Sequence, residues 1–217
     1  MRRRLAVVFL LFTLPFVAAP VFAETAPQAG VHAIYLPTVQ SDAGPALAGS
    51  DFPSVDEFAA SVTDGAAHTV RGVYAANVLA FPVVQQPEDN AGYVSPQGGV
   101  VTQFSLAAIY GVTGLLAHNY AAGDLFDDLA LGQLVYVVYG DGSVKAYVVD
   151  EILRFQALQP YSTTSDFVDL GTGQTLTAGE VFARVYMGGD QVTFQTCIAQ
   201  GGNGSWGRLF VIATPAD

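Results

Sequence analysis

Three residues of scarce type could together catalyse acyl transfer. Cys197 is the only cysteine, His118 is one of three histidines, and Arg208 is one of five basic residues outside the Arg2–Arg4 run. A thiol has an ordinary pKa of ~8.5, and a neighbouring imidazolium favours the thiolate, which is the nucleophile. The same histidine can protonate a leaving amine, and a guanidinium can stabilise an oxyanion. Such a set needs no metal or cofactor, and we expect none.

Each of the three residues also has a plainer interpretation on its own. Cys197 could be a small buried hydrophobe or the site of an intermolecular disulfide. His118 could be a structural or surface residue, and Arg208 a surface charge or a salt-bridge partner. The position of Cys197 at the end of a predicted strand, before Gly201 and Gly202, favours exposure at the rim of a β-barrel. A non-enzymatic binding barrel, in which the three side chains do not converge, remains the alternative.

The sequence around these residues resembles the motifs of sortases. Residues 193–197 read Thr-Phe-Gln-Thr-Cys, which is similar to the Thr-Leu-x-Thr-Cys signature of that family. Residues 114–119, followed by Phe-Asp-Asp-Leu at 126–129, resemble the segment around the catalytic histidine. Residues 207–213 resemble the final strand that carries the arginine. The separations, 197 − 118 = 79 and 208 − 197 = 11 residues, suit the family, and the resemblance covers roughly residues 98–213.

This resemblance implies a mainly β fold, a closed eight-stranded β-barrel with a few short helices. It also implies a cysteine transpeptidase that cleaves a peptide sorting signal and transfers the acyl group to an amine. By motif position, Cys197 would be the nucleophile, His118 the general acid and base, and Arg208 the stabiliser of the oxyanion or substrate. The expected partners are a protein or peptide with a sorting signal and an amine acceptor. A cysteine peptidase or amidase that uses water is the alternative enzyme.

Three further residues are candidates for substrate binding. Thr196 directly precedes Cys197 and could supply a supporting hydrogen bond. Trp206 could line a substrate groove or equally cover the edge of the barrel. Tyr120, which follows His118 and the next residue Asn119, is open to the same two interpretations.

The charge of the chain excludes some partners. The 217 residues carry a net charge of −11, and without Arg2–Arg4 the balance is five basic against 19 acidic residues, or −14. This charge repels the phosphates of nucleic acids and suits anionic lipid poorly. Asp124, Asp127 and Asp128 could bind a hard cation such as calcium, but a solvated turn or helix cap is the favoured interpretation. No oligomerisation signal is visible, and we expect a monomer.

The N-terminus has the pattern of an export signal. Three arginines precede an apolar stretch, and Ala23 has the small side chain required before a signal-peptidase cut. We therefore predict a signal peptide at 1–23, a flexible arm at 24–50 and the sortase-like catalytic barrel at 51–217. The protein is expected to be secreted or at the cell surface, and membrane-bound only if the leader stays uncleaved. Pro15 and Pro20 disfavour a continuous membrane-spanning helix.

Local patterns predict several elements. Capping-box spacings at Ser54 to Glu57 and at Thr177 to Glu180 predict two short helices. Asp141-Gly142 between two β-rich runs predicts a hairpin. We expect strand character at 107–112, and loops at 85–99, 161–177 and 201–205, where turn residues gather.

Overall fold

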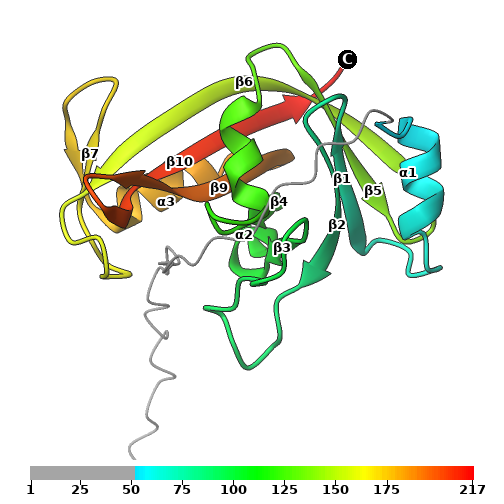
Figure 1. Ribbon diagram of the computed structural model, residues 1–217, viewed down its shortest axis with the longest axis horizontal. Coiled ribbons are helices and arrows are strands. Elements are labelled where there is room, and N and C mark those ends of the chain that lie inside the picture. Colours follow the sequence, from blue (N-terminus) through cyan, green and yellow to red (C-terminus); the bar gives the residue numbers. More distant parts are fainter. Residues whose placement is uncertain (1–51) are drawn as a thin grey trace, which may run out of the picture. The chain divides into compact units, whose positions relative to one another are not determined.

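The computed structural model describes residues 52–217. The predicted signal peptide at 1–23 and the predicted arm at 24–50 lie outside the described residues. Within residues 52–217, the chain forms three α-helices, a 3-10 helix and ten β-strands (Figure 1).

The strands form a sheet that closes on itself. Their order is β10-β9-β4-β3-β2-β1-β5-β6-β7-β8, and β6 pairs with β10 as well. Eight strands therefore make a ring, and β7 and β8 extend beyond it from β6. The predicted mainly β, closed eight-stranded barrel is confirmed. The bounds are β1 Val70–Ala75, β2 Leu79–Gln85, β3 Val101–Phe104, β4 Val112–Leu116, β5 Leu134–Tyr139, β6 Val144–Ala157, β7 Phe167–Asp169, β8 Thr175–Leu176, β9 Gln191–Gln200 and β10 Asn203–Pro215.

Every second side chain along the strands points into the ring, and these apolar side chains fill the barrel. Successive side chains of a strand point to opposite faces of the sheet. Leu115, Phe194, Leu209 and Val211, from three neighbouring strands, belong to one buried apolar cluster inside the barrel. Residues one position away from them therefore point outward.

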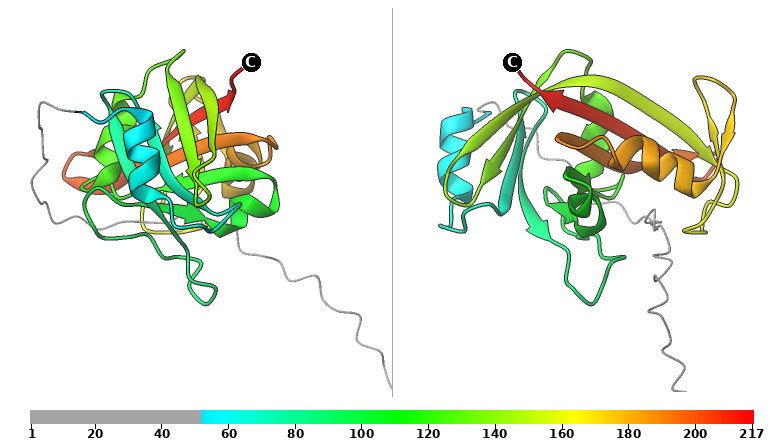
Figure 2. Two further views of the ribbon diagram at one scale, coloured as in Figure 1. Left: turned by 90° about the vertical axis from the view of Figure 1, so that its right-hand side faces the viewer. Right: turned by 180° about the vertical axis from the view of Figure 1, so that it is seen from behind.

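A second apolar cluster lies on the outer face of the sheet. Helix α3 (Ala178–Tyr186) covers this face, as the view from behind in Figure 2 shows. Tyr186 packs edge-on against Phe104 and Phe210, and all three side chains are buried. This cluster extends the barrel on one side and borders the strands that carry the candidate site.

Both predicted capping boxes are present. Ser54 accepts from the backbone N–H of Glu57 at the start of α1 (Val55–Val62), and Thr177 does the same with Glu180 at the start of α3. Each glutamate returns a hydrogen bond to the cap, so two otherwise unpaired donors are satisfied. The predicted hairpin at Asp141-Gly142 joins β5 to β6.

Three local predictions were wrong. The stretch 107–112 is divided between helix α2 (Ser105–Ile109), a turn, and the start of β4. The predicted loop at 161–177 contains β7 and β8. The predicted loop at 201–205 is a tight hairpin, because Gly201 and Gly202 both adopt positive φ and let Gln200 pair with Asn203.

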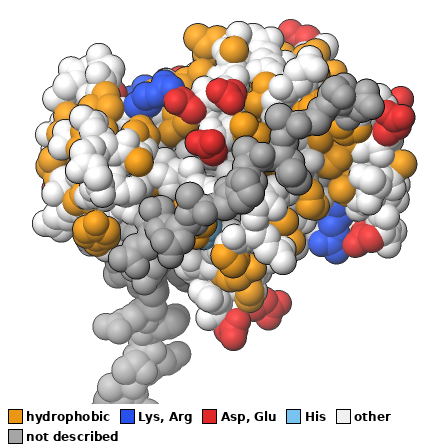
Figure 3. All heavy atoms as spheres, in the orientation of Figure 1, with side chains coloured by type: hydrophobic (Ala, Val, Ile, Leu, Met, Phe, Trp, Pro, Cys, Tyr) orange, Lys and Arg blue, Asp and Glu red, His pale blue; other side chains and the backbone are white. Residues whose placement is uncertain are grey.

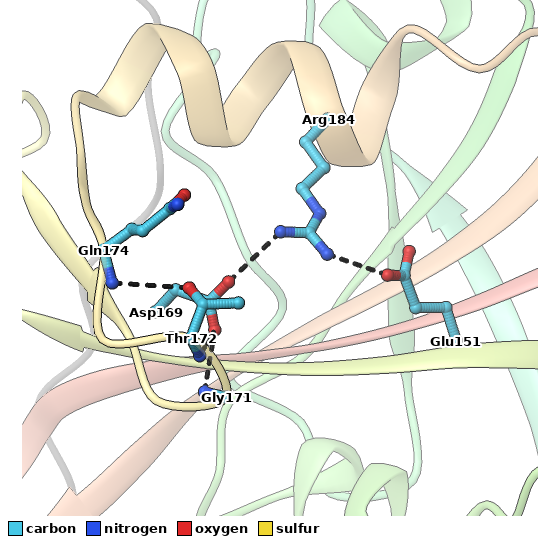
Figure 4. A network of polar contacts seen from close by, with 6 residues as sticks. All are labelled: Glu151, Asp169, Gly171, Thr172, Gln174 and Arg184. Atoms are coloured by element: carbon cyan, nitrogen blue, oxygen red, sulfur yellow. Dashed lines mark hydrogen bonds and ion pairs between the residues drawn. The ribbon is translucent and has the colours of Figure 1, made fainter.

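An ionic network holds α3 to the sheet (Figure 4). Arg184 of α3 donates to Asp169 of β7 at 3.1 Å and to Glu151 of β6 at 2.9 Å. Asp169 also accepts from the backbone N–H groups of Gly171 and Thr172, which close the turn after β7. Helix, strand and hairpin are thereby joined beside the strand pair β6–β10.

Candidate active site

The strand register brings His118, Cys197 and Arg208 into one row. Strands β4 and β9 are parallel with a constant offset of 79 residues, from the Val112–Gln191 pair to the Leu116–Gln195 pair. The ladder continues one step further, because the Ala117 N–H donates to the Gln195 carbonyl at 3.2 Å. The same offset (118 + 79 = 197) carries His118 to the level of Cys197. On the other side of β9, Cys197 is the direct partner of Arg208 in β10.

The row faces outward from the barrel. Ala117, Phe194 and Leu209 belong to the inner cluster, so the alternating positions 118, 197 and 208 point to the opposite face. On that face the row continues the outer apolar surface that α3 covers, because Phe210 of the outer cluster lies two residues beyond Arg208 on the same strand.

Cys197 lies within a strand and not at its end. Strand β9 continues three residues past it to the Gly201-Gly202 turn, and the side chain is only 5% exposed. The predicted exposed position at a barrel rim is therefore wrong. Its physical reason is the tight hairpin, which lengthens β9 and β10 beyond the expected strand ends.

Arg208 is a fully buried cation, 0% exposed. Its Nη atoms donate to the backbone carbonyls of Ser205, Gly207 and Pro160 at 3.1, 2.8 and 3.3 Å. No carboxylate of residues 52–217 pairs with it. Burial lowers the pKa of the guanidinium, whereas the charge of neighbouring Cys197 acts in the opposite direction. A buried charge requires compensation, and within the described residues the charge of Cys197 acts in that direction on Arg208.

His118 is held by a backbone carbonyl and an aromatic ring. Its Nε2 lies 3.2 Å from the carbonyl oxygen of Val94, and its ring stacks on Tyr120 at 4.9 Å between centroids. Because a carbonyl can only accept, the neutral ring carries its proton on Nε2 and a lone pair on Nδ1. Burial lowers the pKa of His118, and the Val94 contact opposes this shift. The neutral imidazole is thus favoured over the imidazolium expected from the sequence.

Unsatisfied polar atoms gather around this row. Within residues 52–217, five buried side-chain atoms have no hydrogen-bond partner, and three are His118 Nδ1, Asn119 Oδ1 and Arg208 Nε. A fourth atom, Thr196 Oγ1, lies in β9 next to Cys197 but on the inner face of the barrel. The fifth, Arg71 Nε, lies 2.8 Å from the carboxylate of Asp64. Buried polar groups are nearly always hydrogen-bonded. The row therefore has hydrogen-bonding capacity for a bound molecule.

The candidate substrate-binding residues fall in different places. Tyr120 reaches the site through its stack with His118. Thr196 is the partner of Leu209 and shares the inner face of the barrel, so the structure does not bring it to the face of Cys197. Trp206 is half-buried two residues before Arg208, in a stretch where the β9–β10 register shifts.

Contacts that the sequence did not reveal position the histidine. The Val94 carbonyl comes from the predicted loop at 85–99, and the Asn119 amide donates to the Gly204 carbonyl at 2.9 Å. Neither contact has a sequence signal, because one uses a backbone atom and the other joins residues 85 positions apart.

The acidic cluster lies in the 3-10 helix η1 (Ala122–Asp128). Asp127 forms an ion pair with Arg154 of β6. The described part of the chain contains no group of three or more His, Cys, Asp or Glu side chains arranged to hold a metal ion.

Acidic side chains outnumber basic ones on the face shown in Figure 3, in line with the net charge. Across residues 52–217, no helix is long and apolar enough to cross a bilayer.

Within residues 52–217, the closed barrel holds Cys197 and Arg208 as direct partners on β9 and β10, and His118 lies two residues past the end of β4. No protein-family model and no curated protein matches the sequence.

Among solved structures, the chain is similar to sortases. Sortase A from Corynebacterium diphtheriae, a lid mutant, is 16% identical with a TM-score of 0.44, over 70% of this chain and 72% of that one. Sortase A from Listeria monocytogenes is 12% identical with a TM-score of 0.42, over 69% and 88%. Sortase E1 from Streptomyces coelicolor, with a tripeptide in the active site, is 17% identical with a TM-score of 0.44, over 69% and 88%. At these identities and TM-scores, the roles of individual residues are inferred from their own geometry.

Proposed function

We propose that this protein is a sortase-like cysteine transpeptidase. The proposal is supported by the pairing of Cys197 with Arg208 on adjacent strands and by the β4–β9 offset, which carries His118 to the level of Cys197. A binding barrel with a structural cysteine gives no reason for these three residue types to share one face and one level. The substrate is a peptide or protein with a sorting signal, and the acceptor is an amine. The predicted leader would export the enzyme to the cell surface or medium.

The first half-reaction forms an acyl-enzyme. His118 Nδ1 takes the proton of the Cys197 thiol, and the adjacent guanidinium favours the thiolate that results. Sγ attacks the carbonyl carbon of the scissile amide, and the electron pair of the C=O bond moves to oxygen. The Nε–H of Arg208, which has no partner among residues 52–217, is the donor that we assign to this oxyanion. The C–N bond then breaks, and the proton on His118 Nδ1 passes to the leaving amine.

The second half-reaction releases the acyl group. An incoming amine attacks the thioester carbon, and His118 Nδ1 accepts the proton that the amine loses. The C–S bond breaks, the sulfur takes up the proton, and the new amide leaves. Water in place of the amine gives a carboxylic acid through the same steps, so the acceptor alone separates a transpeptidase from a peptidase.

Mass spectrometry of the 24–217 chain with a panel of sorting-signal peptides tests the proposal. A thioester adduct on Cys197 is expected, and added triglycine should yield the ligated peptide. The Cys197→Ala variant should form neither product, and Asp150→Ala, altered at an exposed carboxylate, should behave as wild type. Hydrolysis alone at every triglycine concentration would overturn the transfer step. Absence of any Cys197 adduct across the panel would overturn the enzyme assignment.

A further inference from the structure

A buried glutamine organises the loop between β2 and β3. Gln86 follows β2 and is only 8% exposed. Its Nε2 donates to the carbonyls of Ala91 and Tyr93, each at 3.0 Å. Its Oε1 accepts from the backbone N–H and the hydroxyl of Ser105, each at 2.9 Å. Both N–H donors and both lone pairs of the amide are therefore used, which leaves this side chain a single orientation.

These hydrogen bonds fix the residues on both sides of Val94. Tyr93 is held through its carbonyl by Gln86. Ser95 is held through its N–H, which donates to the hydroxyl of Thr102 in β3 at 2.9 Å. Val94 lies between these two anchors, and its side chain packs on the outer apolar cluster. Its carbonyl is thus held at the position where it meets Nε2 of His118.

We propose that Gln86 is a positioning residue that sets the ring orientation and tautomer of His118 through the Val94 carbonyl. Gln86 does not touch the reacting atoms. Its catalytic consequence rests on the proposed function, whereas its effect on the imidazole is a property of the free protein.

The stack with Tyr120 cannot replace this contact. A parallel stack fixes the plane of the imidazole but leaves the ring two orientations that differ by a half-turn about χ2. Only a contact to one nitrogen distinguishes them, and only an acceptor places the proton on that nitrogen. Among the contacts of the His118 side chain, only the Val94 carbonyl engages a ring nitrogen, because Nδ1 has no hydrogen-bond partner within residues 52–217. The Val94 carbonyl therefore decides which nitrogen faces the chemistry.

Nitrogen-15 NMR of the histidine rings in the substrate-free 24–217 chain tests the tautomer directly. Wild type is expected to show a single Nε2–H tautomer for His118 at pH 8. In Gln86→Met, which keeps the volume but removes all four hydrogen bonds, we expect a mixture of tautomers. Gln85→Met is the matched control, because Gln85 is exposed and donates only to the Val70 carbonyl. A wild-type His118 protonated on Nδ1 would overturn the proposal.

Kinetics give the second readout. Gln86→Met should lower kcat about tenfold or more, within the ~10²–10⁴-fold that a general acid–base supplies. KM should stay within about twofold, since Gln86 makes no substrate contact. Should Gln86→Met not fold, Thr102→Val removes the other anchor isosterically and should act in the same direction. Unchanged tautomer and kcat in the folded variant would refute the positioning role.

The outcome separates this proposal from the proposed function. If wild type forms no acyl-enzyme but holds His118 as Nε2–H, and Gln86→Met loses that state, the positioning role stands and the enzyme assignment fails. If acyl transfer proceeds and the Gln86→Met variant transfers equally fast with the same tautomer, the enzyme assignment stands and the positioning role of Gln86 fails.

Discussion

The charge states of the three row residues follow from their burial. Burial lowers the pKa of the Arg208 guanidinium, and the charge of Cys197 opposes this shift, while three backbone carbonyls accept its Nη hydrogen bonds. His118 is favoured in the neutral form, because burial opposes its protonation more than the Val94 carbonyl supports it. Under the proposed function, neutral His118 accepts the proton of the Cys197 thiol, and the guanidinium of Arg208 favours the resulting thiolate.

The lowered pKa of His118 predicts a pH-dependent contribution to stability. The unfolded chain binds a proton at His118 below its ordinary pKa of ~6.5, whereas the folded chain resists protonation until a lower pH. The contribution is therefore fully present above pH ~6.5 and is lost as pH falls from there through the folded pKa. Urea unfolding at pH 7.5 and 5.0 should show a larger loss of stability for wild type than for His118→Gln. An equal loss in both proteins would contradict the assignment.

The position of His118 depends on contacts that its segment makes with β9, β10 and η1. His118 lies two residues past β4, so only its neighbours keep it in line with the strands. The His118 carbonyl accepts from Gly123 in η1, and the Ala117 N–H donates to β9. Asn119 adds a hydrogen bond to Gly204 at the start of β10. Together these connections extend the strand register to the histidine.

Gly123→Ala tests the contact with η1. A Cβ at position 123 would lie 2.7 Å and 2.8 Å from the carbonyl oxygens of Ala117 and His118, too close to be accommodated without displacing backbone. We expect the η1 turn to shift the histidine, lowering the rate of Cys197 acylation about tenfold or more.

The matched control is Gly98→Ala. A Cβ there meets nothing within 4 Å, and its φ is not positive, so acylation and stability should match wild type. A Gly123→Ala protein with the wild-type acylation rate would show that the η1 contact does not position His118.

At the scale of the whole molecule, two buried apolar clusters on opposite faces of one sheet stabilise the fold. The inner cluster closes the barrel, and the outer cluster binds α3 to the strands that carry the row. The ionic network of Asp169, Arg184 and Glu151 joins that helix to β6 and β7 (Figure 4). Because β6 pairs with β10 on the side opposite β9, the network supports the strand that carries Arg208.

Asp169→Ala should destabilise the protein by roughly 1–3 kcal/mol, because it leaves buried hydrogen-bond donors unsatisfied. The buried carboxylate accepts from two backbone N–H groups and from Arg184. Asp150→Ala is the control, since its exposed carboxylate accepts only from Thr214 and should cost little. Chemical denaturation measures both changes. Equal stability of the two variants would contradict the role assigned to the network.

The sequence by itself determined the class of fold and the identity of the row. Residue scarcity, motif spacing and the separation of 79 residues pointed to His118, Cys197 and Arg208, and capping boxes and an Asp-Gly turn located two helices and a hairpin. These features are local or are carried by composition, so a linear chain displays them. The constant offset between β4 and β9 shows why the spacing was informative, since it equals the strand register.

Only the tertiary structure decided the environment of the row. It placed Cys197 within a strand, turned Thr196 to the inner face, and buried Arg208 among backbone carbonyls. It also brought the Val94 carbonyl, fixed by Gln86, onto His118. These contacts join backbone atoms and residues far apart in the chain, which no local pattern records, and burial determines the charge state of His118 only once the barrel has closed.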